Sequence, residues 1–127
     1  MDKMFQKSDA APESDYVLRE LIGIAEKSEV RISLCVNTTD ARVTGELMSS
    51  QAWLAELKKA LVEPGHVAAD QWAVPRFKPG GTLNGDNYFL HLRNAQIIDE
   101  FGARGEREAP FWRGRVSEIW GWQLVTL

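Results

Sequence analysis

The sequence contains a single cysteine, Cys35, so no disulfide bond can form within the chain. No apolar run approaches the roughly 18 residues that a membrane-spanning helix needs. The polar start, residues 1–15, lacks the apolar core of a signal peptide. We therefore expect a soluble protein of the cytoplasm, where thiols stay reduced, with no membrane partner.

An excess of positive charge is also missing. The 15 lysines and arginines are outnumbered by 18 aspartates and glutamates, which gives a formal net charge of −3. General nucleic-acid binders usually have the opposite balance, because neutralised phosphates supply most of their non-specific affinity. The composition therefore argues against general nucleic-acid binding and leaves room only for a local basic patch.

Residues of the kinds used in catalysis and metal binding are few and scattered. The histidines, His66 and His91, have no partner at the spacing of a zinc site, and no C-x-x-C or H-E-x-x-H pattern occurs. The pair Gly80-Gly81 lacks the Lys-Ser/Thr of a phosphate-binding loop. We expect a non-enzymatic protein without cofactor or metal. A small-molecule-binding or catalytic barrel with residues 66–86 as a lid is kept as a third alternative.

Two amphipathic helices are predicted from apolar residues at helical spacing. The first follows a flexible leader, residues 1–13, and runs from an N-cap at Ser14 to about Lys27. The second covers residues 51–63, after a serine cap and before the helix-terminating pair Pro64-Gly65.

Strands are predicted where apolar and polar residues alternate. Residues 30–36 and 41–48 have this period and are joined by turn residues, as in a hairpin. Gly45, inside the second strand, indicates a sharp bend or a close backbone approach. A third extended segment covers residues 87–98 and carries a kink near Arg93-Asn94. These segments predict a bent sheet rather than a flat one.

The C-terminal part combines a charged segment with an aromatic one. Residues 99–110 are expected to form a loop, and residues 111–124, "FWRGRVSEIWGWQL", one strand or a pair of strands. Both faces of residues 119–125 carry apolar side chains, as in a strand that is central or covered by another subunit. We predict one domain, residues 14–127: a mostly β fold with helices, a small bent barrel of about five strands. A helix and a long loop are inserted between strands 2 and 3.

Short motifs of the chain resemble Sm-like barrels. The matching pieces are Gly45-Glu46-Leu47, Arg113-Gly114 and the central strand with Leu90, Leu92 and Ala95. This resemblance implies an oligomeric RNA-binding protein as an alternative function, with Phe89, His91, Arg113 and Arg115 as RNA-contact candidates. Phe89 stands where the resemblance calls for an asparagine of the base pocket, which disfavours RNA.

A narrower resemblance is to gas vesicle accessory proteins of the U type. Four pieces carry it in the same order: Ile32-Ser33-Leu34, Val43 to Ser49, Phe89 to Asn94 and Phe111 to Glu118. The resemblance covers residues 14–124 and implies an accessory or scaffold protein in gas vesicle formation or organisation. Such a protein acts through protein–protein contacts, here with gas vesicle proteins.

A homo-oligomer is expected as well. A domain of 127 residues has limited interior for the three tryptophans of residues 111–124, and a small open barrel exposes strand edges that can pair with another copy. The interface candidates are Leu90, Leu92, Trp112, Trp120 and Trp122.

Overall fold

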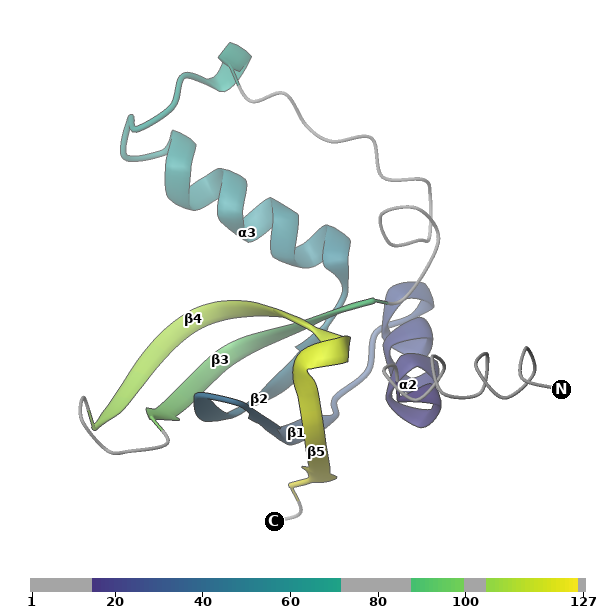
Figure 1. Ribbon diagram of the computed structural model, residues 1–127. Coiled ribbons are helices and arrows are strands. Elements are labelled where there is room, and N and C mark those ends of the chain that lie inside the picture. Colours follow the sequence, from purple (N-terminus) through teal and green to yellow (C-terminus); the bar gives the residue numbers. More distant parts are fainter. Residues whose placement is uncertain (1–14, 72–87, 100–104, 126–127) are drawn as a thin grey trace, which may run out of the picture.

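The computed structural model describes residues 15–71, 88–99 and 105–125 (Figure 1). The predicted leader and most of the long loop lie outside these ranges. The elements in chain order are α2 (Tyr16–Lys27), β1 (Ser33–Thr38), β2 (Ala41–Met48), α3 (Ser50–Val62), the short 3₁₀ helix η2 (Ala69–Gln71), β3 (Phe89–Asp99), β4 (Glu106–Arg115), the 3₁₀ helix η4 (Val116–Glu118) and β5 (Ile119–Leu124).

The five strands form one antiparallel sheet in the order β4-β3-β2-β1-β5. The sheet is strongly curved, so that its two edge strands, β4 and β5, come together at the η4 turn that joins them (Figure 1). This confirms the predicted mostly β class, the five strands, and the insertion of a helix between strands 2 and 3. The sheet is bent but not closed, which agrees loosely with the small open barrel predicted from the sequence. β4 and β5 do not pair with each other in the described sheet, so each leaves one free edge there.

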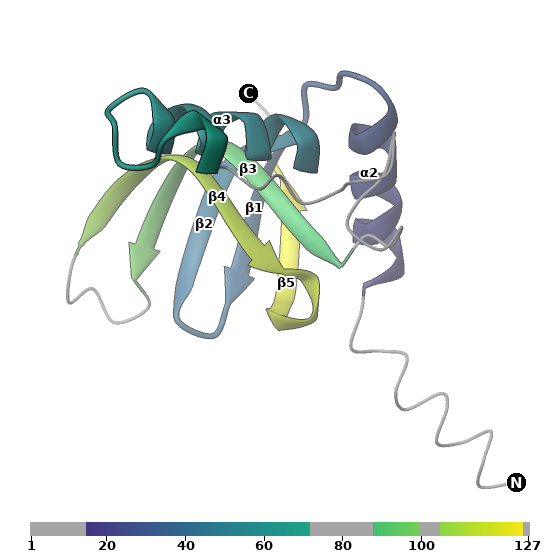
Figure 2. The same cartoon turned by 90° about the horizontal axis from the view of Figure 1, so that it is seen from above.

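The core lies on the inner side of the curve, where α2 packs against the sheet. Leu18, Ile22 and Ala25 form the buried face of α2. The sheet side and the η4 turn contribute Leu34, Val36, Val43, Leu47, Leu90, Leu92, Ala95, Val116 and Ile119. Figure 2 shows the two helices on different sides of the sheet, with α2 beside β5 and α3 over β3 and β4. No helix in the described ranges is both long and apolar enough to cross a membrane.

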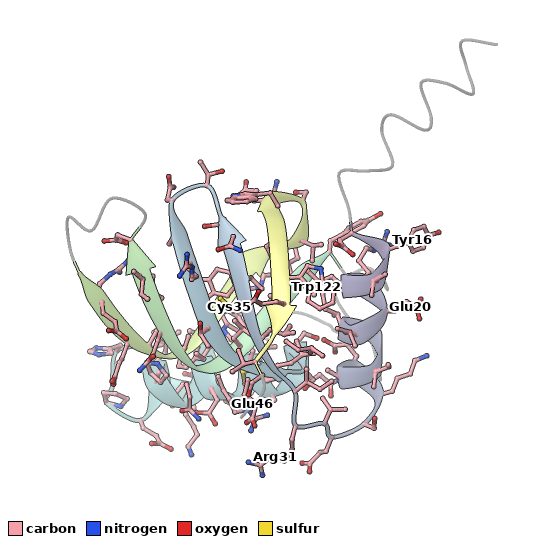
Figure 3. All side chains as sticks on the ribbon, turned by 90° about the horizontal axis from the view of Figure 1, so that it is seen from below. Tyr16, Glu20, Arg31, Cys35, Glu46 and Trp122 are labelled. Atoms are coloured by element: carbon pink, nitrogen blue, oxygen red, sulfur yellow. The ribbon has the colours of Figure 1, made fainter. Side chains whose placement is uncertain are left out.

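Asp15 both caps α2 and fastens it to the sheet. Its Oδ1 accepts from the N–H of Leu18 at 2.9 Å, and its Oδ2 accepts from the indole Nε1 of Trp122 at 2.9 Å. Trp122 reaches from β5 toward the helix, while Tyr16 and Glu20 point away from the sheet (Figure 3). The N-cap is therefore Asp15 and not the predicted Ser14, because Asp15 can serve the helix and the indole together.

Asp15→Ala is expected to destabilise the protein by about 1 kcal/mol at neutral pH through the lost cap. The hydrogen bond from Leu18 holds the pKa of Asp15 below its usual 3.8, and the Trp122 indole acts in the same direction. A lowered folded-state pKa gives stability that is present above the unfolded value and lost as the pH falls through the folded one. Urea unfolding should therefore show a difference between parent and variant at about pH 6 that shrinks below pH 4. A difference that is constant with pH would contradict this role.

A β-bulge bends the sheet at the predicted positions. The pairing of β2 with β3 shifts between Thr44 and Glu46, so that Gly45 faces two residues of β3. One of these, Asn94, has a positive φ of 52°. A Cβ built on Gly45 would lie 3.0 Å from the carbonyl oxygen of Arg93, which is tighter than normal packing. The glycine therefore permits the close backbone approach that the bulge requires.

Gly45→Ala is expected to lower stability by about 2 kcal/mol, or roughly 5–8 °C in melting temperature, since backbone atoms must move to admit the methyl group. The matched control is Gly121→Ala in β5. There, the added Cβ would meet only Asn37 Nδ2, at the ordinary distance of 3.5 Å. Thermal unfolding followed by circular dichroism should separate the two variants. Equal melting temperatures for the two variants would contradict the explanation that a methyl group at position 45 clashes with the backbone of β3.

Two boundaries differ from the predictions. Residues 99–110 were expected to form a loop, but β3 extends to Asp99 and β4 begins at Glu106. The charged residues at the start of β4 lie on an edge strand. Such a strand pairs through its backbone groups and does not need an apolar face. Arg107 of β4 also pairs with Asp99 of β3 at 3.0 Å. The first strand starts at Ser33, three residues later than predicted.

Candidate functional site

Aromatic and arginine side chains gather on the outer face of β3 and β4, next to α3. In the antiparallel register His91 lies opposite Arg113, and Phe89 lies opposite Arg115. Their neighbours Leu90 and Leu92 point to the core, so strand alternation places the other set on the outside. Ring and cation–π contacts join six residues, which we call the arginine–aromatic cluster: Trp53, Phe89, His91, Phe111, Arg113 and Arg115. Phe111 belongs to it through the Trp53 ring, 5.9 Å away.

Arg113 is held at several points although its side chain is exposed. Its Nε donates to His91 Nε2 at 3.1 Å. Its guanidinium lies 3.7 Å from the centre of the Phe89 ring and 5.4 Å from that of Trp53. The Arg115 guanidinium lies 5.9 Å from the same Phe89 ring. Cation–π contacts of this kind orient a guanidinium that would otherwise sample many rotamers.

His91 is neutral in this arrangement. Because its Nε2 accepts from Arg113, its proton must be on Nδ1. Only 3% of the residue is exposed, and burial, helped by the charge of Arg113, lowers its pKa to about 3. Trp53 stacks at a tilt 5.2 Å away. Within the described ranges, His91 Nδ1 and Trp53 Nε1 are buried and have no hydrogen-bond acceptor.

The two arginines of the cluster have no acidic partner among the described residues. The ion pairs in that part of the chain join Arg31 and Arg93 to Glu46, and Arg107 to Asp99. Burial, followed by the charge of Arg115, lowers the pKa of Arg113. An arginine nevertheless stays protonated in proteins, so the cluster presents two neighbouring positive charges.

The four RNA-contact candidates predicted from the sequence therefore lie together. Phe89, His91, Arg113 and Arg115 share one face of the β3–β4 pair. His91, however, is buried and is contacted by Arg113 and Trp53. No sequence pattern had linked Trp53 to this face. Its helical periodicity indicated an apolar helix face but not the sheet surface on which that face packs.

The five interface candidates differ in how much of each residue is exposed. Leu90 and Leu92 are completely buried in the core of one chain and have no surface left for a partner. Trp112 and Trp122 are half-buried and pack against that core. Trp120 on β5 is 71% exposed. Of the five residues, only Trp120 therefore offers most of its side chain to another molecule.

The half-buried position of Trp112 explains why residue 114 is a glycine. The Trp112 indole lies directly over this glycine, and a Cβ at position 114 would collide with the ring. Glycine at this point leaves room for the indole, which packs against the core. Arg113, between the two, points to the opposite side of the strand, which places it in the arginine–aromatic cluster.

A cavity of about 570 Å³ lies between the end of α2, β2 and the start of α3. Several of its charged side chains have partners within the lining or next to it. Glu46 pairs with Arg31 and with Arg93 at 3.5 Å, and Figure 3 shows Arg31 and Glu46 on the same side of the molecule. Glu26 accepts from the backbone N–H of Ser50 at 2.7 Å and from its hydroxyl at 2.8 Å. These bonds join α2 to α3, so we assign the cavity a structural role.

Comparison with protein families gives a match to the family described as gas vesicle protein GvpU-like, over residues 15–127. Comparisons with curated proteins and with solved structures give no match. The matched range spans nearly the whole chain, from the cap of α2 to the end of the sequence, and it agrees with the resemblance seen in the motifs. The chain therefore belongs to the gas vesicle protein GvpU-like family.

Proposed function

We propose that this protein is a non-enzymatic accessory protein of the cytoplasm that takes part in gas vesicle formation or organisation through protein–protein contacts. The observation that carries the proposal is the family match over residues 15–127. The partners are gas vesicle proteins and further copies of the chain itself.

The surface that supports self-association is the edge of β5 that pairs with no strand in the described sheet. Strand edges present unpaired N–H and C=O groups to which another strand can add. On β5 this edge is accompanied by Trp120, 71% exposed, and Leu124, 55% exposed. Exposed aromatic and aliphatic side chains beside an open edge favour a contact between copies. The second free edge, that of β4, supplies a strand to pair with.

A genetic test addresses the vesicle role. In a strain that makes gas vesicles with this gene set, removing the gene should change the number or the arrangement of vesicles in electron micrographs. A plasmid copy of the gene should restore the original pattern. Vesicles with unchanged number, shape and arrangement after the deletion would contradict the proposal.

RNA binding is the second candidate function, because Phe89, His91, Arg113 and Arg115 share one face. We expect no specific binding. The chain is acidic, and the guanidinium of Arg113 covers a face of the Phe89 ring on which a base would stack. Retarded migration of oligo-U at low micromolar protein and physiological salt, abolished by Arg113→Ala, would reverse this expectation.

A further inference from the structure

We propose that the arginine–aromatic cluster is a recognition site for carboxylate side chains on a partner protein segment, in which an acidic residue stands next to an apolar one. This inference rests on the proposed function only in taking the partner to be a protein. It names the chemistry that the partner must present.

The orientation of Arg113 favours a carboxylate ligand. Its Nε is engaged by His91 Nε2 at 3.1 Å, and its plane lies against Phe89 at 3.7 Å. Its terminal nitrogens make no ion pair with a described carboxylate. A planar guanidinium with free terminal donors binds a carboxylate with two parallel hydrogen bonds. Since the side chain is already ordered, binding loses less conformational entropy than it would with a free arginine.

Burial of His91 keeps this arrangement independent of pH. A protonated His91 could not accept from Arg113 and would add a like charge beside it. The residue is only 3% exposed, and this enclosure opposes protonation of the imidazole. The charged groups that face it are Arg113 from β4 and, beyond it, Arg115. No described carboxylate forms an ion pair with either arginine, so an incoming carboxylate meets no competitor in that part of the chain.

The aromatic residues around the arginines, Phe89 among them, indicate what kind of side chain stands next to the carboxylate in the partner segment. Phe89 is half-buried and has a guanidinium near it from each of Arg113 and Arg115. The apolar surface that remains beside the arginines comes from Trp53 and Phe111, which are half-buried and whose rings lie 5.9 Å apart. A segment that brings one or two carboxylates to Arg113 and Arg115 can place its neighbouring side chain on this surface. Arginine and aromatic residues in such a setting are the residue types that dominate binding energy at protein interfaces.

A short acidic segment suits the site better than a nucleic acid does. Affinity for nucleic acid grows with the number of phosphates neutralised, and the cluster offers two cations on a chain of net charge −3. Two cations match one or two carboxylates. The Arg113 guanidinium also occupies a face of the Phe89 ring, so a base cannot stack on that face.

The test uses a rhodamine-labelled peptide with the central sequence Glu-Leu-Glu, and the same peptide with Gln-Leu-Gln, in fluorescence anisotropy titrations of the full chain. We expect the Glu peptide to bind and the Gln peptide not to bind. Arg113→Ala should weaken binding about 10-fold or more, and Arg115→Ala several-fold. Arg113→Lys should not restore binding, because lysine keeps the charge but loses the planar fork. Arg107→Ala, a β4 arginine paired with Asp99, is the matched control and should bind like the parent.

Three results would overturn the inference: no binding of the Glu peptide, equal binding of the Gln peptide, or binding that Arg107→Ala reduces as much as Arg113→Ala. Labelled oligo-U is titrated in parallel. If oligo-U binds with the same arginine dependence and the peptide does not, the site belongs to a nucleic acid. Circular dichroism checks that each variant is folded, and Arg115→Ala tests the site independently of the His91 contact. A protein that fails to bind the peptide but alters vesicles as proposed would sink this inference alone.

Discussion

As the pH falls below 6.5, the protein is expected to lose about 2–3 kcal/mol of stability by pH 4.5 through His91 alone. The ordinary pKa of histidine is 6.5, and burial lowers that of His91 to about 3 in the folded state. Between these values the unfolded chain binds a proton that the folded chain does not, so acid favours unfolding. The slope is about 1.4 kcal/mol for each pH unit. Above pH 6.5 this contribution is constant.

The measurement is urea unfolding at several pH values for the parent and for His91→Gln, which cannot titrate. Carboxylates contribute to the pH dependence of both proteins, so the difference between them isolates His91. We expect the parent to lose more stability than the variant as the pH falls from 6.5 to 4.5. A parallel pH dependence, or an imidazole signal that titrates near 6.5 by NMR, would show that His91 is not held neutral by its surroundings.

Trp120→Glu is expected to reduce the protein in solution to the mass of a single chain, 14.3 kDa. The parent should have at least twice this mass by light scattering at micromolar concentration. In an isolated chain the new carboxylate is in water, since position 120 is 71% exposed, and the fold should be retained. At a contact between copies the same carboxylate would be buried without a partner, which costs several kcal/mol.

Trp122→Glu is the comparison that makes the result specific. Trp122 is two residues away on the same strand, but it packs against the core and donates to Asp15. A glutamate there would lie beside the Asp15 carboxylate, so this variant should unfold rather than dissociate. A parent protein that is monomeric at all concentrations, or a Trp120→Glu variant with the mass of the parent, would contradict self-association through β5.

Local patterns were enough to predict much of the fold. The strand β2 matches its predicted limits, residues 41–48, because strict alternation and flanking turn residues define it on their own. Gly45 and the kink near Asn94 identified the bulge, since glycine admits a close backbone approach within a strand and asparagine tolerates a positive φ. Motif order indicated the family that the comparison confirms.

Features that depend on tertiary packing could not be predicted in the same way. Alternation placed His91 opposite the core face, but it is buried because α3 covers that side of the sheet. The same alternation placed Leu90 and Leu92 on one apolar face of the strand. It could not show whether that face packs in the core of one chain, as it does, or against another subunit. The charged first half of β4, residues 106–110, was expected to be a loop because its pairing with β3 depends on backbone groups, which leave no pattern in the side chains.

The most direct test of the proposed vesicle role is a flotation assay with purified gas vesicles and purified protein. Vesicles rise on centrifugation, and a bound protein rises with them. If the protein acts through contacts with gas vesicle proteins, it should appear in the floating layer in a saturable manner and stay below when vesicles are omitted. Protein that remains in the lower layer at every concentration, with vesicles intact, would contradict the proposed role.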